Sequence, residues 1–123
     1  MKTSELTGAA LDWAVAKCGG RGIEFDDPRD PWLTRDGIAD QPLHSYTPST
    51  DWAQGGPIIE REGITVSKDD GGWAAYFREN LFEDDGSEFW RNGPTPLIAA
   101  MRCYSASKLG DDVTLPLELE QTA

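Results

Sequence analysis

The 123-residue chain has few of the side chains on which metal, redox and thiol chemistry depend. It contains one histidine, His44, and two cysteines, Cys18 and Cys103, which lie in separate apolar stretches. Metal sites and redox pairs instead show closely spaced Cys or His residues. We therefore expect two buried, reduced thiols rather than a disulfide, and we expect neither a metal site nor a cofactor.

Basic residues are also scarce, since 11 Lys and Arg stand against 22 Asp and Glu and give a formal net charge of −11. A surface that neutralises phosphates needs Lys and Arg in excess, so direct nucleic-acid binding is not expected. The charge is still compatible with a small anionic ligand held by a few local Arg or Lys groups. It is also compatible with a surface that imitates nucleic-acid charge and blocks a DNA-binding protein.

Long apolar runs are absent from the sequence, and the N-terminus has no signal-peptide core. We therefore expect no membrane association and a cytoplasmic location. The length predicts a single domain over residues 1–123, in which five tryptophans supply much of the core.

Hydrophobic periodicity and turn residues predict an α+β fold. The expected elements are a helix over residues 4–18, a short strand at 23–25, a hairpin of strands at 64–67 and 73–78, a turn at 84–86, a third strand at 88–91, and a helix from Pro96 to about residue 108. We expect the N-terminal and C-terminal helices to pack on one small, mainly antiparallel sheet, with a long irregular central loop beside them.

Two further segments lack a clear helical period. Residues 21–45 are rich in Asp, Pro and Gly, which favours a solvated loop, although Trp32 is an unusual residue for such a loop. Residues 110–123 alternate like a strand, which Pro116 restricts to an edge strand or an extended arm. Because such an edge can pair with another protomer, a homodimer or higher homo-oligomer is expected.

The most irregular composition lies in residues 46–62, which combine aromatics, hydroxyls, a carboxylate, an amide, glycines and prolines. Such a run suits either the wall of a ligand pocket or a rigid surface connection. We expect Ser49 or Thr50 to cap a short turn, and a second short helix to begin at Pro57 after Gly55-Gly56. The backbone amides at that helix start would form an anion site.

Candidate catalytic groups are few. His44 with Asp51 can form an acid/base pair, and Glu60 with Glu62 can supply two carboxylates, but no spacing specifies a mechanism. We therefore expect a protein that is not an enzyme. Arg102 is a guanidinium on an otherwise apolar predicted helix, where it can extend to solvent, pair with an acid or bind an anion.

Three blocks, residues 4–16, 46–62 and 93–110, occur in the order found in the NinX-type proteins of lambdoid phages and enterobacterial prophages. They cover about half of the chain, which is therefore similar to this family. Pro94 stands where an acidic residue is expected in relatives, so no carboxylate role is carried over there. The resemblance implies a phage accessory protein that acts in the cytoplasm of the infected bacterium, and it implies no particular reaction.

Small phage proteins often antagonise host defence, some by sequestering nucleotide signals, and we apply this by analogy. Our first hypothesis is a noncatalytic protein that captures a cyclic nucleotide or ADP-ribose-type immune signal through stacking, ribose or base-edge hydrogen bonds, and phosphate contacts. The candidate ligand-binding residues are Tyr46, Ser49, Thr50, Asp51, Trp52, Gln54, Gly55, Gly56, Arg61, Thr95 and Arg102.

The second hypothesis is an acidic protein that occupies the nucleic-acid or partner surface of a host enzyme. It predicts that the carboxylates gather on one displayed face of the molecule. The carboxylates concerned are Asp26, Asp27, Asp30, Asp69, Asp70, Asp84, Asp85, Asp111 and Asp112.

Overall fold

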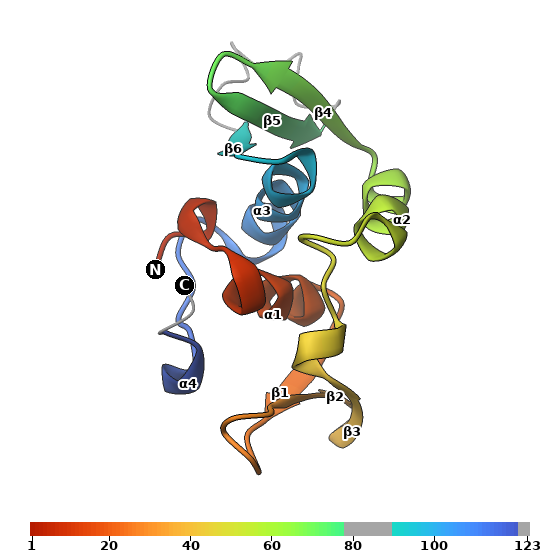
Figure 1. The fold of residues 1–123 in the computed structure, drawn as a ribbon, viewed down its shortest axis with the longest axis vertical. Coiled ribbons are helices and arrows are strands. Elements are labelled where there is room, and N and C mark those ends of the chain that lie inside the picture. The colour runs from red at the N-terminus through yellow and green to blue at the C-terminus, as the bar shows by residue number, and fades with distance from the viewer. Residues whose placement is uncertain (78–89, 121–123) are drawn as a thin grey trace.

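The computed structural model describes residues 1–77 and 90–120 and shows an α+β fold (Figure 1). The described elements are, in chain order, η1 (Thr3–Glu5), α1 (Gly8–Cys18), β1 (Gly22–Glu24), β2 (Trp32–Arg35), β3 (Ile38–Pro42), η2 (Leu43–Ser45), α2 (Trp52–Glu62), β4 (Ile64–Asp69), β5 (Gly72–Phe77), β6 (Arg91–Gly93), α3 (Pro96–Leu109) and α4 (Leu117–Glu120). The predicted α+β class is confirmed, with two small antiparallel sheets, β1-β2-β3 and β4-β5-β6, where the sequence suggested one.

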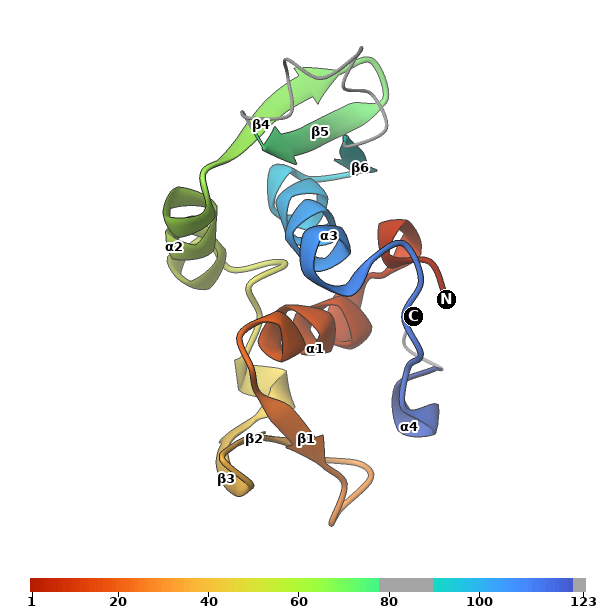
Figure 2. The ribbon, with the colours of Figure 1, turned by 180° about the vertical axis from the view of Figure 1, so that it is seen from behind.

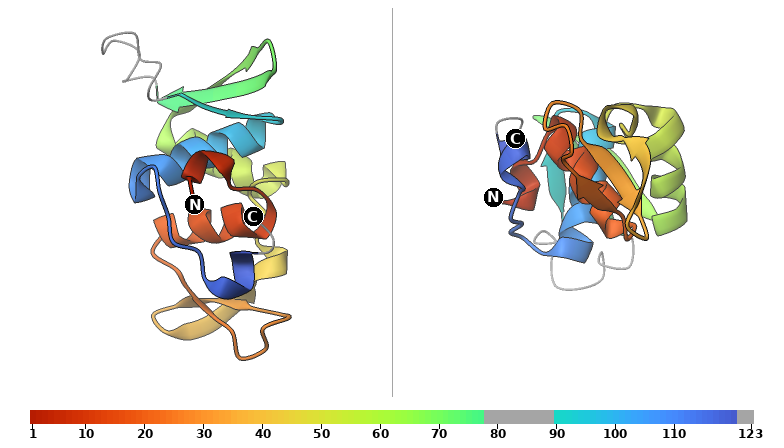
Figure 3. Two further views of the ribbon diagram at one scale, coloured as in Figure 1. Left: turned by 90° about the vertical axis from the view of Figure 1, so that its left-hand side faces the viewer. Right: turned by 90° about the horizontal axis from the view of Figure 1, so that it is seen from below.

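The elements form layers along the longest axis of the molecule. From one end to the other these are the β4-β5-β6 sheet, α3, α1 and the β1-β2-β3 sheet, as Figures 1 and 2 show. α2 lies beside α3, whereas the N-terminal segment and the tail run along the opposite flank (Figures 1 and 3). Leu11 and Val15 of α1 and Met101 of α3 are fully buried, so the centre of the core lies where these two helices pack together.

The residues at their N-terminal ends explain where α3 and α1 begin. Thr95 caps α3 as predicted, because its Oγ1 accepts a hydrogen bond from the Ile98 amide at 3.1 Å, and Pro96 is the first helical residue. α1 begins at Gly8 rather than at residue 4. The φ of 56° at Gly8, which glycine adopts readily, lets the chain turn between η1 and the helix.

Residues 21–45 form a three-stranded sheet, so the predicted solvated loop is wrong for most of this segment. Asp36 (φ 55°) and Gly37 (φ 81°) join β2 to β3, and their left-handed conformations are those of a type I′ hairpin turn. Asp40 of β3 accepts a hydrogen bond from Arg21, which holds the pKa of this carboxyl below its ordinary value. The Asp and Gly residues that suggested a loop therefore build a hairpin.

The predicted hairpin at residues 64–78 is present as β4 and β5, joined by Asp70-Gly71. Trp73, Ala75 and Phe77 contact the core from one face of β5, as the alternation predicted. β6 supplies the predicted third strand but begins at Arg91. The remainder of that prediction, the turn at 84–86 and the end of the second strand at residue 78 lie outside the described residues.

The tail forms a helical turn and not the predicted edge strand. Leu115, just before Pro116, and Leu119, in α4, are both buried. Before α4 the tail pairs with the N-terminal segment of the same chain, where the Val113 amide donates to the Met1 carbonyl at 2.9 Å. This pairing uses backbone groups that an extended arm would offer to a second protomer.

The second half of the central stretch, residues 46–62, is one helix, α2, and not the predicted short turn followed by a second short helix. The Asp51 carboxylate caps this helix by accepting a hydrogen bond from the Ala53 amide. Gly63, with a φ of 70°, ends the helix. Gly55 lies inside the helix, and a Cβ at this position would meet the Pro48 carbonyl and Leu97. The predicted anion site is therefore wrong, because the amides assigned to it lie within the helix and not at its N-terminus.

The first half of the central stretch is fixed to α1 by a buried carboxyl. Asp12 is 5% exposed, and its Oδ1 accepts a hydrogen bond from the Ser49 amide at 2.9 Å. Burial raises the pKa of Asp12 from 3.8 to about 6, although its contacts with the Ser49 hydroxyl and amide oppose that shift. The loop before α2 is thus held on the core by a group that titrates in mildly acidic solution.

Gly55 and Gly56 give a matched test of this packing. Gly55→Ala places a Cβ against the Pro48 carbonyl and 2.6 Å from Leu97 Cδ2, so we expect the free energy of unfolding to fall by about 1–3 kcal/mol. Gly56→Ala meets the Trp52 ring at 3.9 Å, so its better helix propensity should raise stability by roughly 0.5–1 kcal/mol. Urea denaturation measures both values. Equal effects at the two positions would contradict the close approach at Gly55.

Asp12 predicts a dependence of stability on pH. Because its folded pKa of about 6 lies above 3.8, the folded protein binds more protons than the unfolded chain between these values, and stability falls as pH rises through this window. About two pKa units correspond to roughly 3 kcal/mol at most.

Asp12→Asn keeps an oxygen acceptor for the Ser49 amide and removes the titration. We expect the stability of this variant relative to the original chain to rise between pH 4 and pH 6 and to be constant above pH 7, as followed by urea denaturation. Taking the difference cancels the titration of the other carboxylates. A difference that does not change with pH would show that Asp12 titrates normally.

Candidate functional site

The side chains predicted to bind a ligand from the central stretch are instead bound to one another. Gln54 Oε1 accepts a hydrogen bond from the Thr47 amide at 3.0 Å. Its Nε2 donates to the Ser45 carbonyl at 3.2 Å and to Thr47 Oγ1 and Asp51 Oδ2 at 3.1 Å each. The groups of Gln54 and Asp51 that were assigned to ribose or base edges are therefore used inside the loop.

The aromatic and hydroxyl residues of this stretch differ in their burial and their partners. Tyr46 is half-buried with the Arg21 guanidinium 5.2 Å from its ring centre, and burial raises the pKa of its hydroxyl. Ser49 is buried and Thr50 is exposed. Trp52, 57% exposed, stands at the start of α2. With Gly55 and Gly56 inside the helix, the stretch consists of a packed loop followed by α2.

The three other predicted residues lie apart from one another. Arg61, near the end of α2, pairs with Glu62 at 2.8 Å. Thr95 is used to cap α3. Arg102 lies farther along α3, where its guanidinium reaches the N-terminal segment and β6. Of all the predicted ligand-binding residues, Arg102 alone lines the groove described next.

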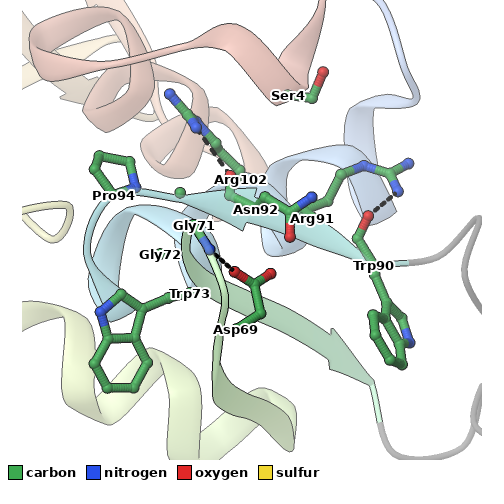
Figure 4. Close-up of a pocket in the computed structure, with 11 residues that line it drawn as sticks. Ser4, Asp69, Gly71, Gly72, Trp73, Trp90, Arg91, Asn92, Pro94 and Arg102 are labelled. Atoms are coloured by element: carbon green, nitrogen blue, oxygen red, sulfur yellow. Dashed lines mark hydrogen bonds between the residues drawn. The ribbon is translucent and has the colours of Figure 1, made fainter.

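A cavity of about 680 Å³ opens where the β4-β5 turn, β6 and the start of α3 meet the N-terminal segment (Figure 4). We call it the Arg102 groove. Its lining residues are Ser4, Asp69, Gly71, Gly72, Trp73, Trp90, Arg91, Asn92, Gly93, Pro94 and Arg102.

Two glycines let β6 approach its neighbours closely enough to form this groove. A Cβ on Gly93 would lie 2.6 Å from the Ala99 nitrogen of α3, and a Cβ on Gly72 would lie 2.7 Å from the Gly93 carbonyl. Side chains at these positions would force β6 away from α3 and β5. The close approach brings the Asn92 carbonyl within reach of Arg102 (Figure 4).

The Arg102 guanidinium is held by backbone carbonyls and not by a carboxylate. Its Nε donates to the Leu6 carbonyl and its Nη1 to the Asn92 carbonyl, each at 2.9 Å. Burial lowers the pKa of Arg102 and the charge of Glu5 raises it, but a guanidinium stays protonated at neutral pH. Among the described arginines, those with a carboxylate within 4.0 Å are Arg21, Arg29, Arg35, Arg61 and Arg91. Arg102 is the exception in the described part of the chain.

Aromatic rings and one acid complete the groove. Trp90 is 40% exposed and stacks on Tyr76, with ring centres 5.1 Å apart and an interplanar angle of 22°. Trp73 is half-buried. Asp69 accepts a hydrogen bond from the Gly71 amide at 3.0 Å and lies between the two indoles in the view of Figure 4. The groove therefore offers a cation for an anion, flat rings for stacking and a carboxylate for a hydrogen-bond donor.

The sequence analysis missed most of these residues. Trp90 and Arg91 are adjacent in the sequence, and an aromatic next to a cation was a signal that could have drawn attention to them. Trp73 was predicted as part of the second hairpin strand, and Asp69 as one of the carboxylates of the second hypothesis. These residues come from separate segments, so their meeting depends on the pairing of β5 with β6 and on the packing of β6 on α3.

The candidate catalytic pairs are not assembled. His44 Nε2 lies 3.6 Å from Asp30 Oδ1, whereas the Asp51 carboxylate contacts α2 amides and Gln54. Glu62 is paired with Arg61. The acid/base pair suggested for His44 and Asp51 is therefore wrong.

Cys103 is buried and Cys18 is half-buried, and both are free thiols, as predicted. Burial raises the pKa of each to about 11. In residues 1–77 and 90–120 no group of three or more His, Cys, Asp or Glu side chains is arranged to hold a metal ion. Within the same residues, none of the helices has the length and apolar character needed to cross a bilayer.

The acidic residues do not form the single displayed face that the second hypothesis predicted. Asp26, Asp27 and Asp30 belong to the β1-β2 connection at one end of the molecule (Figure 1). Asp69 ends β4 and Asp70 begins the turn to β5, at the other end of the molecule. The pair at 111–112 lies on the tail, and residues 84 and 85 lie outside the described residues.

Comparison with known proteins gives one family. The family model described as "Bacteriophage P22, NinX" matches residues 2–108, a range that contains every residue lining the Arg102 groove. No curated protein matches the chain. Because the match spans most of the sequence, the chain belongs to the bacteriophage P22 NinX family of phage accessory proteins.

Proposed function

We propose that the protein binds a small anionic ligand with a flat ring in the Arg102 groove and sequesters it without catalysis. For a phage protein in the host cytoplasm, the expected ligand is a nucleotide-like immune signal of the cyclic nucleotide or ADP-ribose type. The observation that carries this proposal is the half-buried Arg102 guanidinium, which faces the groove without a carboxylate partner among the described residues.

The charge of Arg102 favours a phosphate. A guanidinium presents several N–H donors in a rigid plane that matches phosphate oxygens. Its Nη2 group donates to no acceptor in the described part of the chain, so this edge is available to a ligand. Because the chain carries a net charge of −11, its acidic surface discourages binding of anions elsewhere.

The remaining lining suits a nucleoside. A base can stack on an indole such as Trp73 or Trp90, and such stacking contributes about 1–3 kcal/mol per base. Asp69 can accept hydrogen bonds from ribose hydroxyls or from the edge of a base. The cavity volume of about 680 Å³ lies within the roughly 300–1,000 Å³ typical of small-molecule sites.

The same lining supports sequestration rather than turnover. Among the described residues that line the groove there is no His, Cys or Lys, and Asp69 is the one carboxylate. General acid/base catalysis usually needs a second titratable group beside the first. A bound nucleotide would therefore be held and not converted.

Isothermal titration calorimetry with mononucleotides, cyclic dinucleotides and ADP-ribose tests this proposal. We expect binding by the original chain and a loss of about 10-fold or more in affinity for Arg102→Gln, because hydrogen bonds to charged groups contribute about 1.5–3 kcal/mol. Arg102→Lys should retain part of the affinity, since it keeps the charge. Trp52→Ala is the matched control from the central stretch and should bind normally.

Circular dichroism of the unliganded variants separates a lost contact from lost folding, since Arg102 also joins two backbone segments. If a folded Arg102→Gln variant binds the nucleotides with normal affinity and Trp52→Ala binds them more weakly, the binding site lies in the central stretch. If no member of the panel binds the original chain, the proposal fails. The acidic partner-binding hypothesis, acting on a host protein, would then be the one to pursue.

A further inference from the structure

A second cavity shares three lining residues with the Arg102 groove. It has a volume of about 290 Å³ and is lined by Lys2, Thr3, Ser4, Trp90, Arg91 and Asp111. Ser4, Trp90 and Arg91 line both cavities, whereas Arg102 lines the first alone and Lys2 the second alone. A ligand can therefore extend from Arg102 past Trp90 toward Lys2.

Three cations follow this path in a chain with only 11 basic residues. Lys2 and Arg102 have no carboxylate within 4.0 Å in residues 1–77 and 90–120. Arg91 lies between them and pairs with Asp111 at 2.9 Å, so its position is fixed. Two cations without acidic partners among the described residues thus line two cavities that share Ser4, Trp90 and Arg91.

The wall that carries Lys2 is held in place by the pairing of the two ends of the chain. Lys2 forms a β-bridge with Asp112. On either side of it, the Thr3 amide donates to the Asp111 carbonyl and the Val113 amide donates to the Met1 carbonyl, each at 2.9 Å. These bonds hold the backbone at Lys2, which lines the second cavity from a strand-like segment.

We propose that the site takes a ligand with two phosphates separated by a nucleoside, as in a cyclic dinucleotide, and not one with a single phosphate or two adjacent phosphates. One phosphate binds at Arg102 and the other at Lys2 beside Arg91, while the intervening nucleoside contacts Trp90, which is shared by both cavities. This inference rests on the proposed function, because it assigns the ligand class of the same groove. Its added content is the second anion site at Lys2.

Calorimetry on the full chain, with any tag at the C-terminus, tests the second site. The probes are AMP and GMP, ADP, and the cyclic dinucleotides of adenine and guanine. We expect the best cyclic dinucleotide to bind at least about 10-fold more tightly than its mononucleotide and than ADP. Lys2→Gln should remove most of this advantage and leave mononucleotide affinity unchanged, whereas Lys17→Gln, at a lysine that lines neither cavity, should bind like the original chain.

Two results would overturn the inference while leaving the proposed function intact. The first is equal affinity of the original chain for mononucleotides, ADP and cyclic dinucleotides. The second is a Lys2→Gln variant that keeps the full preference for cyclic dinucleotides, or that loses affinity for all probes alike. If no probe binds the original chain, the proposed function fails and this inference fails with it.

Discussion

The Arg102 guanidinium joins three parts of the chain that are distant in sequence. From α3 it donates to the Leu6 carbonyl before α1 and to the Asn92 carbonyl in β6. Each hydrogen bond from a charged donor contributes about 1.5–3 kcal/mol, and part of this offsets the cost of removing the cation from water. Without a carboxylate among the described residues to neutralise it, the charge remains directed at the groove. Thus one contact closes this end of the fold and, in the function we propose, also binds an anion.

The central stretch shows how a composition that suits ligand binding can serve packing. A loop that packs against α1 and α3 buries backbone amides and carbonyls, and these need hydrogen-bond partners. Gln54 and Asp12 supply them, to Thr47 and Ser49 respectively. Gly55, which suggested a phosphate-binding turn, is needed because Pro48 passes directly against the helix. The same residue types serve packing here.

Local signals predicted local structure well. Thr95 and Pro96 set the start of α3, and Asp70-Gly71 identified the β4-β5 hairpin, because capping and turn formation depend on neighbouring residues alone. The hairpin at Asp36-Gly37 carried the same kind of signal, but the surrounding Asp and Pro residues concealed it. In the tail, an alternating pattern was given more weight than the four-residue spacing of two buried leucines.

The candidate site was less predictable than the fold for a physical reason. Its lining comes from residue 4, residues 69–73, residues 90–94 and Arg102, so it exists only after β6 has paired with β5 and packed on α3. Arg102 could be singled out because a guanidinium within an apolar helix needs an explanation wherever it lies. Trp73 and Trp90 needed no such explanation, because an aromatic residue in a strand is ordinarily part of the core.

Mass spectrometry of the small molecules released from denatured protein tests the central claim most directly. The protein would be purified under mild conditions from bacteria with an active nucleotide-signalling defence. The account predicts a nucleotide in proportion to protein for the original chain and for Trp52→Ala, and none for a folded Arg102→Gln variant. An empty original chain, or a nucleotide retained in full by Arg102→Gln, would contradict the claim that the Arg102 groove captures such a signal.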